Sequence, residues 1–93
     1  MKTIWKYVLK EEIEQKIKMP GDAVILCVKN QHEKAVLYVL HDSKYTEAMT
    51  KQVIIYLFAT GYETDLMDIT MRYLDTLLFD NGEHVFHVFC KGE

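Results

Sequence analysis

Four histidines and two cysteines are the side chains of this sequence best suited to binding a metal ion, and they are His32, His41, His84, His87, Cys27 and Cys90. Metal ligands must share a face, which requires a spacing of two on a strand or four on a helix. His84 and His87 are three residues apart on a predicted strand, so they should point to opposite faces. We therefore predict no metal site, with one of this pair packed and hydrogen-bonded and the other exposed.

Candidates for nucleophilic or acid–base chemistry are equally poor. His41 and Asp42 are adjacent, and neighbouring strand residues diverge, so they should not form a working pair. Ser43 is the only serine and has no nucleophile-elbow glycines around it. Cys27 and Cys90 lie inside apolar runs, where we expect buried, reduced thiols. The sequence predicts a protein that is not an enzyme and has neither catalytic residues nor a cofactor.

An acidic stretch is the clearest candidate for a binding surface. Residues 61–83 hold six acidic residues against Arg72 alone. Their spacing does not match a calcium loop, which alternates its carboxylates closely. A solvated surface is the ordinary interpretation, and a contact surface for a basic partner is the functional one. Tyrosines in loops, such as Tyr45 and Tyr62, suit interfaces. The predicted binding residues are Tyr62, Glu63, Asp65, Asp68 and Arg72.

Length and composition limit the other possibilities. The 93 residues predict one domain, 1–93, and 49% hydrophobic with 27% charged residues is typical of a globular protein. The first twelve residues are charged throughout and do not resemble a signal peptide. No apolar run approaches the ~20 residues of a membrane span, so we expect a cytoplasmic protein. A net charge of −3 without a basic stripe argues against nucleic acid.

Seven segments have the character of β-strands, being rich in β-branched and aromatic residues or alternating in polarity. Residues 12–19 alternate most regularly, with Ile13, Gln15, Ile17 and Met19 on one face; a helix is the competing interpretation. Residues 23–29 are apolar on both faces, which predicts a central strand that forms a hairpin with 35–41. The predicted strands are 2–9, 12–19, 23–29, 35–41, 52–59, 70–79 and 84–90.

The connections between these strands are less uniform. Asn81-Gly82 predicts a two-residue type I′ hairpin turn, because both residues tolerate positive φ. Residues 42–51 could form a short helix capped by Asp42 or Ser43, or a polar loop. Residues 62–69 could form a helical turn capped by Thr64, or an acidic loop. The expected fold is mostly β: a small antiparallel sandwich or barrel-like sheet of six to seven strands, with room for one short helix.

Several short motifs stand towards the two ends of the chain: M-K-T-I-W-K-Y at the start, the M-P turn, I-L-x-V, T-G at 60–61, R-Y-L-D-T at 72–76, N-G, and V-F-H-V-F at 85–89. In these motifs the chain resembles a family of small, uncharacterised proteins from bacteriophages and their bacterial hosts. The segments 41–52 and 62–70 depart from the family's usual pattern. The resemblance implies a phage or prophage origin and transfers no catalytic residue.

Two functional hypotheses follow from these observations. The leading one is a non-enzymatic protein that binds a host or anti-phage defence protein with a basic surface, inside an infected bacterium. The alternative is a protein that sequesters a small molecule, a nucleotide signal, using tyrosines and a few basic residues. A sheet this small should also leave a strand edge exposed, which homodimerisation would cover.

Overall fold

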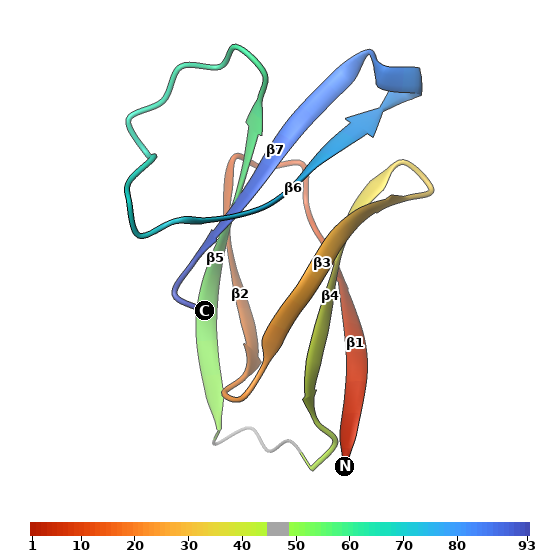
Figure 1. Cartoon of the computed structure of the whole chain (residues 1–93), viewed down its shortest axis with the longest axis vertical. Coiled ribbons are helices and arrows are strands. Elements are labelled where there is room, and N and C mark those ends of the chain that lie inside the picture. The colour runs from red at the N-terminus through yellow and green to blue at the C-terminus, as the bar shows by residue number, and fades with distance from the viewer. Residues whose placement is uncertain (45–48) are drawn as a thin grey trace.

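The computed structural model describes residues 1–44 and 49–93, which form seven strands in two antiparallel sheets (Figure 1). The three-stranded sheet has the order β1-β4-β3, and the four-stranded sheet has the order β2-β5-β7-β6. The strands are β1 (Lys2–Val8), β2 (Glu14–Pro20), β3 (Val24–Gln31), β4 (Lys34–Asp42), β5 (Thr50–Ala59), β6 (Arg72–Phe79) and β7 (His84–Lys91). The predicted mostly β, antiparallel architecture is confirmed, and each predicted strand overlaps an observed one.

The core lies between the two sheets and is filled by alternate residues of their strands. Leu37 and Val39 of β4 and Val53 and Ile55 of β5 are fully buried, as expected for central strands with every second side chain turned inward. The alternation predicted for 12–19 is confirmed, because Gln15 and Met19 of β2 are buried while its charged residues Glu14, Lys16 and Lys18 are exposed.

The position of β3 corrects one prediction. This strand forms the expected hairpin with β4, but it is an edge strand and not a central one. Its outward-facing Val24 and Leu26 remain 53% and 47% exposed. The prediction was wrong because β3 carries apolar residues on its exposed outer face as well as on its buried face, which is the sequence pattern of a strand buried on both sides.

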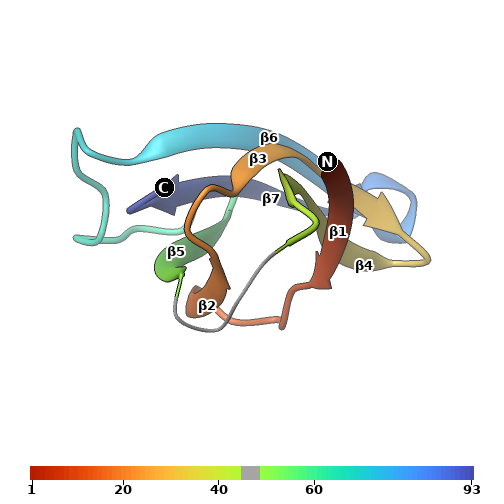
Figure 2. The same ribbon diagram turned by 90° about the horizontal axis from the view of Figure 1, so that it is seen from below.

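The two sheets adjoin at two seams, the β3–β6 seam and the β1–β2 seam, and several hydrogen bonds cross the first. At the β3–β6 seam, Asn30 Nδ2 donates to the Leu78 carbonyl at 2.7 Å and the Asp80 N–H donates to Glu33 Oε2 at 2.9 Å. Lys29 also pairs with Asp75 across it, at 3.3 Å. At the other seam, β1 and β2 lie apart and are joined by the connection 9–13, as Figure 2 shows from below.

The closing hairpin is confirmed, but its turn is longer than predicted. β6 and β7 are joined by Asp80–Glu83, which includes the single 3₁₀ turn η1 (Asp80–Gly82). Asp80, Asn81 and Gly82 all have positive φ, at 51°, 54° and 87°. Asn81 and Gly82 thus supply the left-handed backbone that the sequence predicted, and Asp80 extends it by one residue.

The two segments of uncertain type have different outcomes. Asp42 and Thr50 belong to strands, and the predicted helix between them, with Tyr45, falls largely on residues outside the described part. Residues 62–71 form a loop, in which Thr64 Oγ1 accepts a hydrogen bond from the Leu66 N–H at 3.0 Å instead of capping a helix. In residues 1–44 and 49–93, no helix is long and apolar enough to span a membrane.

Candidate functional site

The loop 60–71, called here the β5–β6 loop, projects beside the four-stranded sheet (Figure 1). On that sheet's outer face, aromatic rings form a continuous row. Tyr56 and Phe58 alternate with the core residues of β5, so they face away from the core, yet they are only 3% and 5% exposed. Phe58 contacts Tyr56, Phe89 and Tyr62 at ring distances of 5.8, 5.9 and 6.4 Å. The loop therefore starts from a packed aromatic base.

Asp68 fixes the far part of this loop. Its carboxylate accepts hydrogen bonds from Lys91 Nζ at 2.9 Å and from the Thr70 N–H at 2.8 Å, and also from the Thr70 hydroxyl. These contacts, led by that of the Thr70 hydroxyl, lower the pKa of Asp68 to about 2. Tyr62 and Asp68 thus hold the loop at two points, one through ring stacking and one through an ion pair.

Between and beside these anchors, the loop presents apolar and acidic side chains to solvent. Leu66, Met67 and Ile69 are 40%, 50% and 101% exposed. Glu63 and Asp65 are also exposed, and within the described part of the chain their carboxylates form neither a hydrogen bond nor an ion pair. Apolar groups next to acidic groups on an anchored loop are typical of a protein-binding surface. The acidic pattern pointed to this segment, while the exposure of its apolar residues was not predicted.

Four of the five predicted binding residues belong to this loop, and the fifth, Arg72, is the first residue of β6 and pairs with Glu93. Its Nε donates to Glu93 Oε1 at 2.8 Å, and the other carboxylate oxygen of Glu93 accepts the Ile25 N–H at 2.8 Å. Burial opposes protonation of Arg72, but the Glu93 carboxylate outweighs it and the pKa is raised. Arg72 therefore supports the contact between β6 and β3.

The histidines have different surroundings. His87 lies between Thr60 and Thr76, at 2.7 and 2.9 Å, while His84 is exposed on the opposite face of β7. One histidine of the pair is therefore hydrogen-bonded and the other exposed, as expected, but His87 is half-buried on the outer face of the sheet and does not pack inside as predicted. His41 is buried, and its Nδ1 donates to the backbone carbonyl of Asp42 and not to the carboxylate. In the described ranges, no three His, Cys, Asp or Glu residues could hold a metal ion together.

A cavity of about 1050 Å³ opens at one end of the sandwich. Its floor is apolar and includes Leu57, Phe79 and Phe86. Lys10 and Lys34 line its rim together with a larger number of acidic residues, which are Glu11, Glu12, Glu33 and Asp80. His84 also belongs to the lining. The rim is formed by three connections that are distant in sequence: the β1–β2 connection, the β3–β4 turn and the β6–β7 turn. The spacing of residues in the sequence therefore could not predict this cavity.

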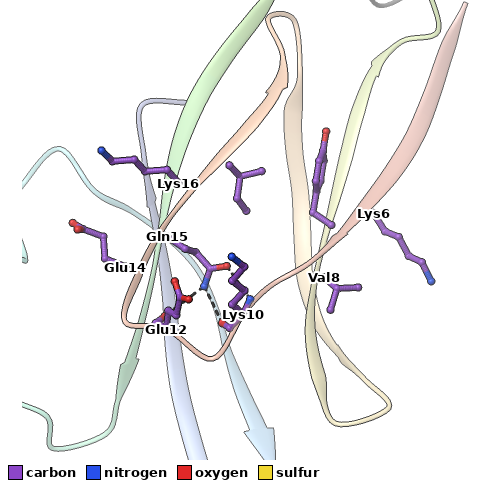
Figure 3. A pocket seen from close by; sticks show the side chains of 9 residues that line it. Lys6, Val8, Lys10, Glu12, Glu14, Gln15 and Lys16 are labelled. Atoms are coloured by element: carbon purple, nitrogen blue, oxygen red, sulfur yellow. Dashed lines mark hydrogen bonds between the residues drawn. The ribbon is translucent and has the colours of Figure 1, made fainter. Parts of the chain in front are cut away.

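A second hollow, of about 600 Å³, is the groove between β1 and β2 (Figure 3). Gln15 lies beside it and ties down the connection between these strands. Its Oε1 accepts the Lys10 N–H at 2.9 Å, and its Nε2 donates to the carbonyls of Lys10 and Glu12 at 2.9 and 3.4 Å. These bonds explain why a polar residue occupies an inward position of β2, because a buried amide needs partners.

The comparisons with known proteins bear on the family of this chain. No match was found among curated proteins, and none among solved structures. The family model described as a domain of unknown function, DUF7352, matches residues 1–93. The chain therefore belongs to the DUF7352 family.

Proposed function

We propose that this protein is a non-enzymatic binding protein that docks its β5–β6 loop onto a host or anti-phage defence protein with a basic surface. One observation carries the proposal. Leu66, Met67 and Ile69 are exposed on a loop held by Asp68 and by the stacked Tyr62. An anchored loop loses little conformational entropy when it binds, so more of its contact energy appears as affinity.

The chemistry of the loop indicates the kind of partner. Ile69 is fully exposed, and burying such a side chain contributes about 1.5–3 kcal/mol. Glu63 and Asp65 add negative charge beside it. Acidic groups at the edge of an interface accelerate association with a positive surface and select against negative ones. A partner with an apolar pocket surrounded by lysines or arginines fits this combination.

The proposed setting is the cytoplasm of an infected bacterium. It rests on the resemblance of the chain ends to phage and prophage proteins, including the V-F-H-V-F run that forms much of β7. Cys27 and Cys90 are free thiols, which suits a reducing compartment.

The test compares three tagged proteins in captures from bacterial host lysate, followed by binding measurements with the purified partner. Ile69→Ser removes the most exposed apolar group of the loop. Val24→Ser is the matched control, because Val24 is 53% exposed on the other sheet. We expect the wild type and Val24→Ser to bind the same basic protein, Ile69→Ser to lose it, and added salt to weaken it. Equal binding by all three, or no partner enriched over a mock capture, would reject the proposal.

The end cavity supports a second candidate function, the sequestration of a small molecule. Its volume of about 1050 Å³ and its apolar floor are typical of ligand pockets, and Lys10 and Lys34 could contact a phosphate. The acidic excess at the rim weighs against an anionic nucleotide. A thermal-shift panel of nucleotides tests this hypothesis. A nucleotide that binds should raise the midpoint of unfolding, because a ligand at 100 times its Kd stabilises the fold by about 2.7 kcal/mol. A flat panel would exclude the nucleotide hypothesis.

A further inference from the structure

β2 is an edge strand of the four-stranded sheet, and every second residue of it turns its backbone polar groups away from the sheet. Hydrogen-bonded pairs alternate with non-bonded pairs along an antiparallel ladder. The Leu57 N–H donates to the Ile13 carbonyl and the Gly21 N–H to the Met49 carbonyl, so the odd-numbered residues of β2 bond to β5. The N–H and C=O groups of Glu14 and Lys16 therefore face outward along the edge of the four-stranded sheet.

The space beside this edge is open. The groove of about 600 Å³ between β1 and β2 is lined by Glu14 and Lys16 on one side and by Lys6 and Val8 on the other (Figure 3). The side chains of Glu14 and Lys16 point to the outer face of the sheet, and Glu14 lies beside the Tyr56 hydroxyl there. An exposed strand edge of this kind is a template for pairing with another strand.

The charges on β2 are complementary to themselves when the strand is reversed. Two copies of β2 in antiparallel register, with Gln15 opposite Gln15, place Glu14 of each copy opposite Lys16 of the other. The same register places Glu12 opposite Lys18 and Ile13 opposite Ile17. Both members of the Glu14–Lys16 pair have outward-facing backbone groups, so they can form the hydrogen-bonded ring that antiparallel pairing needs.

We infer that the protein forms a two-fold dimer in which β2 pairs with β2 of a second copy, Glu14 against Lys16, to give a continuous eight-stranded sheet. The other edges fit this role less well. β1 carries Lys2 and Lys6 on its outer face and no acidic residue, so its self-pairing would bring lysines together. β3 and β6 are bridged to each other across their seam. The paired edge does not include the exposed apolar residues of the β5–β6 loop, although Glu14 lies near Tyr56 and Lys91 at the base of that loop.

Charge exchange between two variants tests the pairing. Glu14→Lys leaves lysines at 14 and 16, and Lys16→Glu leaves glutamates at both positions, so each variant repels itself. An equimolar mixture restores opposite charges at both crossings. Lys34→Glu makes the same change of charge at the exposed start of β4, outside the groove, and is the matched control.

Analytical ultracentrifugation of each protein, and native mass spectrometry of the mixture with one variant ¹⁵N-labelled, give the outcome. We expect the wild type and Lys34→Glu to dimerise equally and the two β2 variants to dimerise at least roughly tenfold more weakly. The mixture should form the heterodimer, which also shows that both variants fold. A monomeric wild type, no recovery in the mixture, or a loss of dimer in Lys34→Glu would overturn the inference. Ile69→Ser should leave the dimer unchanged, which separates this test from that of the proposed function.

Discussion

The Nζ of Lys91 donates a hydrogen bond to the carboxylate of Asp68 at 2.9 Å, and this contact fastens the β5–β6 loop to the last strand of the four-stranded sheet. Without it, the loop from Gly61 to Met71 would be attached mainly at its ends and through Tyr62. The ion pair therefore determines how well the exposed residues of the loop are held in place.

The pH dependence of this anchor follows from the lowered pKa of Asp68. The pKa is about 2 in the folded protein against an ordinary value of 3.8. Ionised Asp68 therefore stabilises the fold above about pH 4, and this contribution is lost as the pH falls towards about 2. NMR titration of the Asp68 carboxyl carbon should show the low midpoint, and the loop amides should lose protection from hydrogen exchange in the same range.

Lys91→Met tests how much of the lowered pKa of Asp68 comes from the ion pair with Lys91. Removing the ammonium should raise the pKa of Asp68 towards 3.8 and increase exchange of the loop amides at neutral pH. The Thr70 contacts remain, so the return should be partial. An unchanged Asp68 midpoint in Lys91→Met would show that the lysine does not anchor the loop.

Gln15 is expected to control the stability of the β1–β2 connection. Gln15→Ala removes three hydrogen bonds and leaves the N–H and C=O of Lys10 without their partner. Each hydrogen bond of this kind contributes about 0.5–1.5 kcal/mol to the free energy of unfolding. Urea unfolding should show the corresponding decrease in the free energy of unfolding.

Lys16→Ala is the matched control for Gln15, because Lys16 is the next residue and its side chain is exposed. Surface substitutions of this kind usually change the free energy of unfolding by less than about 0.5 kcal/mol. Equal effects of the two variants would mean that the amide network does not support the connection. The comparison should be made at protein concentrations low enough to keep both variants monomeric.

Local pattern was sufficient to predict most of the strands. The alternation of Gln15, Ile17 and Met19 with charged residues identified β2, and Asn81-Gly82 identified the final hairpin. Both signals come from neighbouring residues, where period and turn chemistry act directly. The acidic stretch likewise identified the loop that contains Glu63 and Asp65.

Features that join distant segments were not predictable in this way. The edge position of β3 depends on which strands pair, and Val24 and Leu26 gave no sign of it. The contact of Glu93 with Ile25 spans 68 residues, and the end cavity needs three separate connections. The pairing of Arg72 with Glu93 likewise joins residues that are 21 positions apart and could not be predicted from the stretch 61–83.

Phe58 should stabilise the fold although it faces away from the core. Its ring is 5% exposed and contacts three other aromatic rings. Phe58→Ala should lower the free energy of unfolding by about 3–5 kcal/mol, as in a core, and should increase hydrogen exchange at Tyr62. Leu78→Ala, at a side chain that is 57% exposed, should have a small effect. A similar small effect of Phe58→Ala would show that the outer aromatic row is not a second packed layer.

The two thiols should differ in reactivity because their surroundings differ. Cys90 is 1% exposed, and burial, aided by the Glu93 carboxylate, raises its pKa above 9.0, whereas Cys27 is only half-buried. A thiol reagent at pH 8 should modify Cys27 at least about tenfold faster than Cys90, because the thiolate is the reactive form and must also be reached. Mass spectrometry of digested protein measures both rates, and Cys27→Ser should retain only the slow one. In denaturant the two rates should become equal, while equal rates in the folded protein would contradict the burial of Cys90.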